Sequence, residues 1–154
     1  MTSAVQAMVV VPAAPGRVFD LLTDPARHRE FDATGMVGAP VTGAKLTHVG
    51  QVFVMNMTYR AGEHIEDYQS DNHVTVLAPG RAIAWATATR GGAPLGWLWR
   101  YDLAVEPDGT AVTLTYDWTN TPPANIRRFG VPLVDADGLA RSLQLLSAAC
   151  QASL

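Results

Sequence analysis

The sequence has few of the residues that mark several large classes of protein. Cys150 is the one cysteine among 154 residues, so the chain has no internal disulfide framework. Charged residues make up only 16%, and a net charge of −3 leaves no basic stripe for phosphates, which argues against nucleic acid as a partner. No apolar run approaches the roughly 20 residues that a membrane span needs.

Signals for export and for cofactors are also scarce. Residues 1–6 have no basic segment and no clear signal peptide, which together with the lone cysteine predicts a cytoplasmic protein. Cys150 falls on an apolar stripe and is interpreted as a small buried hydrophobe rather than a nucleophile. His28, His48 and His73 match no metal-ligand spacing, and no phosphate loop or dinucleotide motif occurs. We therefore expect no metal and no cofactor.

The composition is that of a globular domain. Hydrophobic residues make up 48% of the chain, and no repeat, charge block or linker-like tract divides it. A domain of this length buries roughly 68–70% of its unfolded surface, which is enough for a core without disulfides or metals. We expect one domain over residues 1–154.

The first thirty residues predict a strand followed by two short helices. Residues 4–12 are rich in strand-forming residues. Pro15 suits the first turn of a helix, with apolar residues at helical spacing behind it. Asp24 and Pro25 then have the order of an N-cap and a first helical residue, which predicts a second short helix ending near Phe31.

Strands separated by turn-forming residues dominate the middle of the chain. Short connections between consecutive strands indicate an antiparallel meander. The expected strands are 45–49, 51–60, 63–77, 81–90, 95–106 and 110–119. Residues 121–123 end the sheet, and the loop that follows has room for one helical turn.

The last segment, 135–152, predicts a long helix. Its single apolar stripe runs at intervals of four, three and four residues and consists of Leu139, Leu143, Leu146 and Cys150. The sheet is the only large surface against which this stripe can be buried.

Strand alternation predicts which side chains face that helix. A four-residue turn over residues 106–109 brings the apolar residues of two strands onto one face, so register and pattern agree. The expected pairs are Val105–Thr110, Leu103–Val112, Tyr101–Leu114, Trp99–Tyr116 and Trp97–Trp118.

The earlier strands contribute to the same face. Phe53, Met55, Met57 and Tyr59 alternate inward, as do Ile83 and Trp85. A tight turn at residues 61–62 would place His64, Glu66 and Tyr68 opposite Tyr59, Met57 and Met55, although Gly62 could also support a bulge. From the residues alone, a solid core and a partly hollow core both satisfy this pattern.

Three stretches carry a resemblance to a known family. They are residues 11–25 (VPAAPGRVFDLLTDP), 79–85 (PGRAIAW) and 108–113 (DGTAVT). With the order of elements over essentially the whole chain, they resemble the helix-grip superfamily of START, birch-pollen-allergen-like and polyketide cyclase proteins (SRPBCC). The resemblance implies an α+β fold in which a curved seven-stranded antiparallel sheet wraps a long C-terminal helix, with two short helices after the first strand.

The resemblance favours the hollow core and a cavity that binds, transports or sequesters a small apolar or aromatic molecule. The expected ligand-binding residues are Phe53, Met55, Met57, Tyr59, Tyr68, Trp85, Trp97, Trp99, Tyr101, Tyr116, Trp118, Leu139, Leu143 and Leu146. The members of this fold have many functions, so the fold does not choose among them.

Two alternatives stay open. The first is a polyketide cyclase or aromatase that acts by acid–base catalysis, with Tyr101, Tyr116, His64 and Glu66 as candidates. It lacks a cation for the substrate carbonyl, because Arg60, Arg90 and Arg100 point outward and the adjacent pair at 127–128 is interpreted as a surface pair. The second is a co-chaperone-like protein-interaction module with a filled core and an exposed apolar patch. A monomer and a homodimer are both compatible with the sequence.

Overall fold

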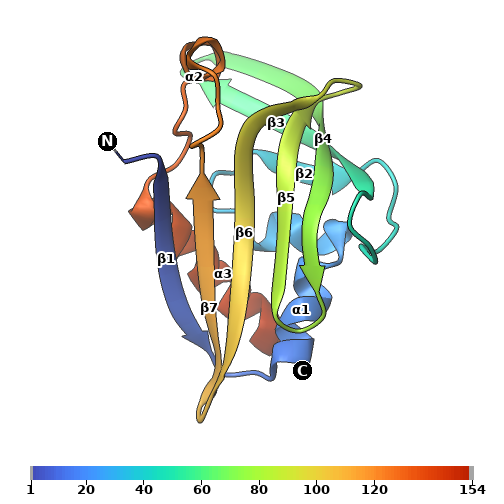
Figure 1. Ribbon diagram of the computed structural model, residues 1–154, viewed down its shortest axis with the longest axis vertical. Helices are drawn as coiled ribbons and strands as arrows, with labels where there is room; N and C mark the ends of the chain where they lie inside the picture. Colours follow the sequence, from blue (N-terminus) through green and yellow to red (C-terminus); the bar gives the residue numbers. More distant parts are fainter. Residues whose placement is uncertain (1, 153–154) are drawn as a thin grey trace.

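A computed structural model describes residues 2–152 as a seven-stranded antiparallel sheet with helices on its concave side (Figure 1). The order of strands in the sheet is β1-β7-β6-β5-β4-β3-β2, so the first strand lies at one edge and the second at the other. The strands are β1 (Ala4–Val11), β2 (Val37–Pro40), β3 (Val52–Ala61), β4 (His64–Ala78), β5 (Ala82–Thr89), β6 (Pro94–Glu106) and β7 (Gly109–Asp117). This is the α+β helix-grip architecture that the sequence predicts.

Two short helices connect β1 to β2, as predicted. The helix α1 (Pro15–Leu22) begins with a proline, which has no amide proton to leave unpaired at a helix start. The 3₁₀ helix η1 (Pro25–Phe31) follows, and the Asp24 carboxylate caps it by accepting a hydrogen bond from the amide of Ala26 at 3.2 Å. Because β1 and β2 lie at opposite edges, this pair of helices has to cross the concave side of the sheet.

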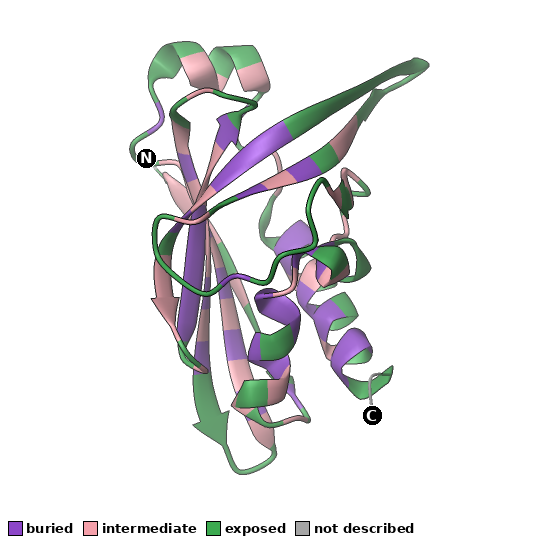
Figure 2. Ribbon diagram, turned by 90° about the vertical axis from the view of Figure 1, so that its right-hand side faces the viewer, coloured by how far each residue is buried: buried purple, intermediate pink, exposed green. Residues whose placement is uncertain are grey.

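Two further helices follow β7, and the first of them lies at the top of Figure 1, beyond the end of the sheet. The short helix α2 (Pro123–Phe129) ends at Gly130, whose φ of 69° is the left-handed conformation of a helix C-terminus. The long helix α3 (Ala136–Ala152) starts where the Asp135 side chain accepts a hydrogen bond from the amide of Gly138 at 2.8 Å. Figure 2 shows α1 and α3 beside the sheet, each with buried and exposed residues alternating along it.

The predicted register of β6 and β7 is confirmed. Trp99 pairs with Tyr116 and Tyr101 with Leu114, and the ladder ends at Glu106 and Gly109 around the expected turn. The expected pair of Trp97 with Trp118 lies beyond the last pair of this ladder.

The predicted register of β3 and β4 is wrong by two residues. Tyr59 pairs with Glu66 and Met57 with Tyr68, because the two-residue turn consists of Gly62 and Glu63 rather than residues 61–62. Gly62 adopts a φ of 60°, as the first central residue of a II′ hairpin turn requires. A shift of two residues leaves each side chain on its predicted face, so the inward set is unchanged.

The predicted strand at 45–49 is also wrong, and β2 at Val37–Pro40 takes its place. Glycine and proline give residues 37–40 little strand signal. The structure requires Gly38, because a β-carbon there would lie 2.9 Å from the backbone oxygen of Asn56. In the 45–49 loop, Leu46 is buried as a single residue and its amide donates to the carbonyl of Thr23 at 2.8 Å, so its burial does not depend on strand pairing.

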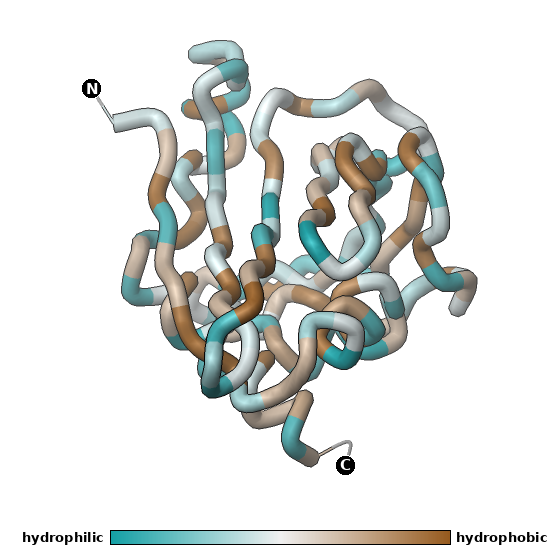
Figure 3. The backbone as a smooth tube through the Cα atoms, turned by 60° about the horizontal axis from the view of Figure 1, so that its bottom comes forward, coloured by the Kyte–Doolittle hydropathy of each residue, from teal (hydrophilic) through white to brown (hydrophobic). Residues whose placement is uncertain are grey.

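The core lies between the concave face and the helices. Hydropathy changes from residue to residue along the strands, as expected for a sheet with one covered face (Figure 3). Leu143, Leu146 and Cys150 of α3 are fully buried, as are Val112 and Tyr116 of β7. The stripe predicted on the last helix is therefore part of the core. Within residues 2–152, no helix has both the length and the apolar composition to cross a bilayer.

Two glycines show whether the close backbone contact at the β6–β7 turn costs more stability than a positive φ alone. At Gly109 φ is 146° and an added β-carbon would lie 2.0 Å from the carbonyl oxygen of Val11, whereas at Gly80 φ is 70° with open space around it. We expect Gly80→Ala to lower the free energy of unfolding by about 1–2 kcal/mol. Gly109→Ala should cost more than about 4 kcal/mol, because backbone atoms have to move. Urea unfolding measures both; equal losses would contradict the predicted clash.

Candidate functional site

A cavity of about 810 Å³ lies between the concave face of the sheet, η1, the segment from α2 to residue 134, and the start of α3. Ten of the predicted ligand-binding residues line it: Phe53, Met55, Met57, Tyr59, Tyr68, Trp85, Trp97, Trp99, Tyr101 and Leu139. Alternation along β3, β4, β5 and β6 brings nine of these side chains to one wall, and Leu139 faces the cavity from α3.

The other four predicted ligand-binding residues lie outside the cavity. Leu143 and Leu146 are fully buried in the core further along α3. Tyr116 stacks on Trp99, with ring centroids 4.1 Å apart and planes inclined by 7°, so Trp99 separates it from the cavity. Its hydroxyl also accepts a hydrogen bond from the amide of Leu133 at 3.2 Å. Trp118 packs against Tyr116 and is part of the same layer.

The helix η1 supplies two aromatic residues that the sequence analysis did not include. His28 stacks on Trp85 with ring centroids 5.1 Å apart and planes inclined by 16°, and it meets Phe53 edge-on at 5.5 Å. Phe31 lies 5.3 Å from His28 and 6.3 Å from Tyr101, again between ring centroids. The buried positions Pro25, His28 and Phe31 recur every three residues. That spacing is the 3₁₀ period and could have identified this face from the sequence.

The protonation state of His28 follows from its surroundings. The side chain is only 5% exposed and lines the cavity, while its Nε2 lies 2.8 Å from the carbonyl oxygen of Leu22. A carbonyl can only accept, so Nε2 carries the proton and Nδ1 keeps its lone pair. Burial lowers the pKa of His28 to about 4, against the opposing effects of the Leu22 carbonyl and the Asp24 carboxylate. The ring is therefore neutral at pH 7.

Tyr101 is the buried phenol of the same wall. It lies next to Trp85, with ring centroids 5.8 Å apart, and its burial raises the pKa of the phenol well above its usual range. The carboxylate of Asp32 adds to this shift. That carboxylate also lines the cavity and accepts hydrogen bonds from the amides of Thr34 and Val37 at 3.0 and 2.9 Å. The inner wall thus disfavours a second negative charge.

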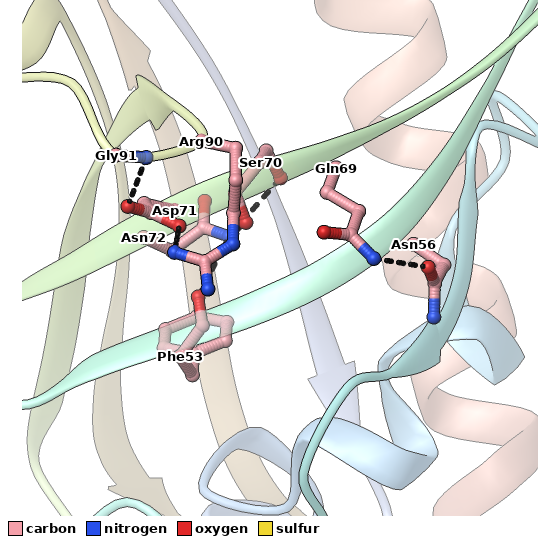
Figure 4. Close-up of polar contacts among 8 residues, drawn as sticks. All are labelled: Phe53, Asn56, Gln69, Ser70, Asp71, Asn72, Arg90 and Gly91. Carbon is pink, nitrogen blue, oxygen red and sulfur yellow. Dashed lines mark hydrogen bonds and ion pairs between the residues drawn. The ribbon is translucent and has the colours of Figure 1, made fainter.

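A short polar band crosses the wall where β4 meets β5. The Asn72 side-chain amide donates to the carbonyl of Phe53 and to the hydroxyl of Ser70, both at 3.3 Å (Figure 4). Its oxygen accepts from the Thr87 hydroxyl at 3.3 Å. Ser70, Asn72 and Thr87 all line the cavity. Their polar groups are largely satisfied by one another, so the band adds polarity without a free charge.

Asp71, between Ser70 and Asn72 on β4, forms hydrogen bonds to the turn between β5 and β6. Asp71 points to the other face, where its carboxylate accepts from the amide of Gly91 at 2.8 Å and from Arg90 at 3.2 Å (Figure 4). Asp71 is buried, so these bonds fix the β5–β6 turn against β4.

His64 and Glu66, predicted as an acid–base pair, lie at the solvated end of the β3–β4 hairpin. Their side chains are 66% and 62% exposed, with 3.7 Å between Nε2 and Oε2. Glu66 lines the rim of the cavity and His64 does not. The structure therefore does not place this pair beside the buried aromatic wall.

The arginines that the sequence analysis sought on the strands lie on α2. Arg127 and Arg128 line the outer part of the cavity while remaining exposed, and the Arg128 guanidinium lies 4.8 Å above the ring of Phe129. The pair interpreted as ordinary surface residues thus borders the cavity. Nothing in the local sequence indicates that these arginines border the cavity, because their place depends on where the segment after β7 lies relative to the sheet. In the described part of the chain, no group of three or more His, Cys, Asp or Glu side chains could hold a metal ion.

The neutral His28 makes stability depend on pH. Its pKa is about 4 in the folded protein against 6.5 in the unfolded chain, so only the unfolded state takes up this proton as the pH falls through that interval. The full contribution is present above pH 6.5, and we expect about 3 kcal/mol to be lost by pH 4. Urea unfolding of wild type and His28→Phe across this range, with NMR titration of the imidazole, measures the effect. An imidazole that titrates near 6.5 in the folded protein would contradict it.

Comparisons with known proteins agree with this architecture. The uncharacterised protein Rv0088 of Mycobacterium tuberculosis is 29% identical over 149 residues, which is 88% of this chain and 61% of that protein. The chain therefore spans about 61% of the length of the curated relatives it matches.

Solved structures share the fold at lower identity. Protein Ms6760 of Mycobacterium smegmatis superposes with a TM-score of 0.69 at 15% identity, covering 99% of this chain and 94% of that one. DynU16, a protein of the dynemicin biosynthetic locus, gives 0.65 at 15% identity over 99% of this chain and 49% of its own.

The family of activator of Hsp90 ATPase homolog 1-like proteins matches residues 12–151, from the end of β1 to the last turn of α3. That range includes η1, α2 and every strand that lines the cavity. The chain belongs to this family and has the helix-grip fold of the SRPBCC superfamily.

Proposed function

We propose that this domain binds a small, mainly apolar aromatic molecule in the cavity and carries or sequesters it. The observation that supports this most directly is a void of about 810 Å³ bordered by the rings of Phe31, Phe53, Trp85, Trp97 and Trp99. Ligand sites commonly have volumes of roughly 300–1,000 Å³, apolar walls and a few placed polar groups.

The distribution of polar groups supports a mainly uncharged ligand. The inner wall contains the neutral His28 ring and the Tyr101 phenol, and the Asn72 band is largely satisfied within the protein. The Asp32 carboxylate also lines the cavity, but it already accepts hydrogen bonds from two backbone amides. The exposed charges of Glu66, Arg127 and Arg128 border the outer part. A ligand that fills the inner part would therefore exchange water for rings rather than for ions.

The protein-interaction alternative has less support, because it requires a filled core. Instead, a void of about 810 Å³ lies beside the rings of β3, β5 and β6. Protein interiors rarely keep such space without a use for it.

A cyclase of the polyketide type is the second candidate. Its support is that a phenol and an imidazole with a free lone pair, Tyr101 and His28, border the same cavity. Aldol closure and dehydration need groups that donate and accept protons next to the substrate. Arg127 and Arg128 on α2 are the cations closest in role to the one this chemistry requires.

Binding can be tested with N-phenyl-1-naphthylamine, an uncharged aromatic probe that fluoresces in apolar sites. We expect saturable binding by the wild type and at least tenfold weaker binding by Thr89→Phe, which adds a ring where Thr89 lines the cavity. Val105→Phe is the matched control, because Val105 is 78% exposed and lies outside the cavity. Absence of saturable binding, or equal weakening in both variants, would contradict the proposal.

The cyclase candidate makes a separate prediction about two tyrosines. With a poly-β-ketone substrate, Tyr101→Phe should change the product distribution, because the Tyr101 phenol borders the cavity. Tyr116→Phe should not, since the Tyr116 hydroxyl binds the Leu133 amide outside the cavity. Product analysis by liquid chromatography and mass spectrometry distinguishes the two. The same products from wild type and Tyr101→Phe would argue against the enzyme.

A further inference from the structure

His28 carries a nitrogen in the inner wall that makes no hydrogen bond to the described chain, and unlike the indole nitrogens of the tryptophans in this wall it is an acceptor. The Nε2–H of His28 is committed to the Leu22 carbonyl, and no residue within 2–152 bonds to its Nδ1. Two side-chain polar atoms of the described chain are both fully enclosed and without a hydrogen-bond partner, namely His73 Nε2 and Thr121 Oγ1. His28 Nδ1 also lacks a partner, but it is not fully enclosed. Nδ1 therefore borders open space, and for a side chain only 5% exposed that lines the cavity, this space is the cavity.

The hydroxyl of Tyr101 likewise lacks a hydrogen-bond partner in the described chain. It is also not among the enclosed unpaired atoms. The His28 and Tyr101 rings have two neighbours in common. Between ring centroids, Trp85 lies 5.1 Å from His28 and 5.8 Å from Tyr101. Phe31 lies 5.3 Å from His28 and 6.3 Å from Tyr101. An acceptor and a hydroxyl thus border one aromatic part of the cavity.

The chemistry of the two groups limits what can satisfy both. Nδ1 of a neutral imidazole only accepts a hydrogen bond, whereas a phenol can donate or accept. A ligand hydroxyl can donate to His28 and accept from Tyr101 at the same time. A carboxylate has no proton for Nδ1 and would add charge near Asp32, which lines the same cavity.

We infer that the inner wall recognises a neutral hydroxyl group on an aromatic or enolic ligand, which donates to His28 Nδ1, with the Tyr101 hydroxyl as its second partner. This rests on the proposed function, since it specifies the chemistry of the ligand that the cavity holds. The rings of Trp85, Phe31 and Phe53 surround His28, so the unsaturated carbon that carries this hydroxyl would meet aromatic side chains.

Naphthalene and 2-naphthol differ by one hydroxyl. Comparing them therefore tests binding of an aromatic molecule separately from recognition of the hydroxyl. Quenching of tryptophan fluorescence in the full chain gives both affinities. We expect the wild type to bind 2-naphthol roughly tenfold more tightly than naphthalene, as a buried, otherwise unpaired acceptor gains its hydrogen bond. His28→Phe should lose this preference while its affinity for naphthalene changes by less than about threefold. His48→Phe, at an exposed position outside the cavity, should behave as the wild type.

The outcomes are distinguishable. Equal affinity of the wild type for the two probes, or a preference that survives in His28→Phe, overturns the assignment of the hydroxyl and leaves the cavity as a binding site. Failure of both probes to bind overturns the proposed function and the inference with it.

A measurement on the wild type covers the case in which His28→Phe does not fold. The ¹⁵N resonance of His28 Nδ1, an unprotonated nitrogen, should shift when 2-naphthol is added, because the nitrogen then accepts a hydrogen bond. Naphthalene should change it much less. The same shift with both compounds would contradict the inferred contact.

Discussion

Pairing of β1 with β7 puts the first strand at one edge of the sheet, while the next strand, β2, pairs with β3 at the other. The 25 residues from 12 to 36 must therefore cross the whole concave side. This crossing brings η1 over the sheet. It places His28 against Trp85 and Phe53, and Phe31 against Tyr101. The aromatic wall is thus a product of topology as much as of strand alternation.

The void results from how little of the sheet the long helix covers. Leu143 and Leu146 are buried further along α3, which packs against β1, whereas Leu139, nearer the start of the helix, lines the cavity. The rings on β3, β5 and β6 face a region that η1 and α2 enclose without filling. Of the two cores that the sequence pattern allows, the structure has the partly hollow one.

The alternation of side chains along each strand predicted most of the residues in the cavity wall, because it depends only on the two-residue period of a strand. The two-residue error in the β3–β4 register changed the partners of Tyr59 and Met57 and left their faces unchanged. The sequence could not reveal β2, since Gly38 is required by the distant backbone of Asn56. Tyr116 shows the same limit: its inward face was predicted, but its separation from the cavity by Trp99 depends on side-chain stacking.

The β3–β4 hairpin extends beyond the body of the molecule, and its outer half is exposed (Figure 2). Substitutions at exposed positions usually change stability by less than about 0.5 kcal/mol. The rim residues Tyr59, Glu66 and Tyr68 lie on this arm, away from the fully buried core at β7 and α3. Under the proposed function, mutation of the arm would change ligand selectivity at little cost to folding, because the rim and the core lie in separate parts of the molecule.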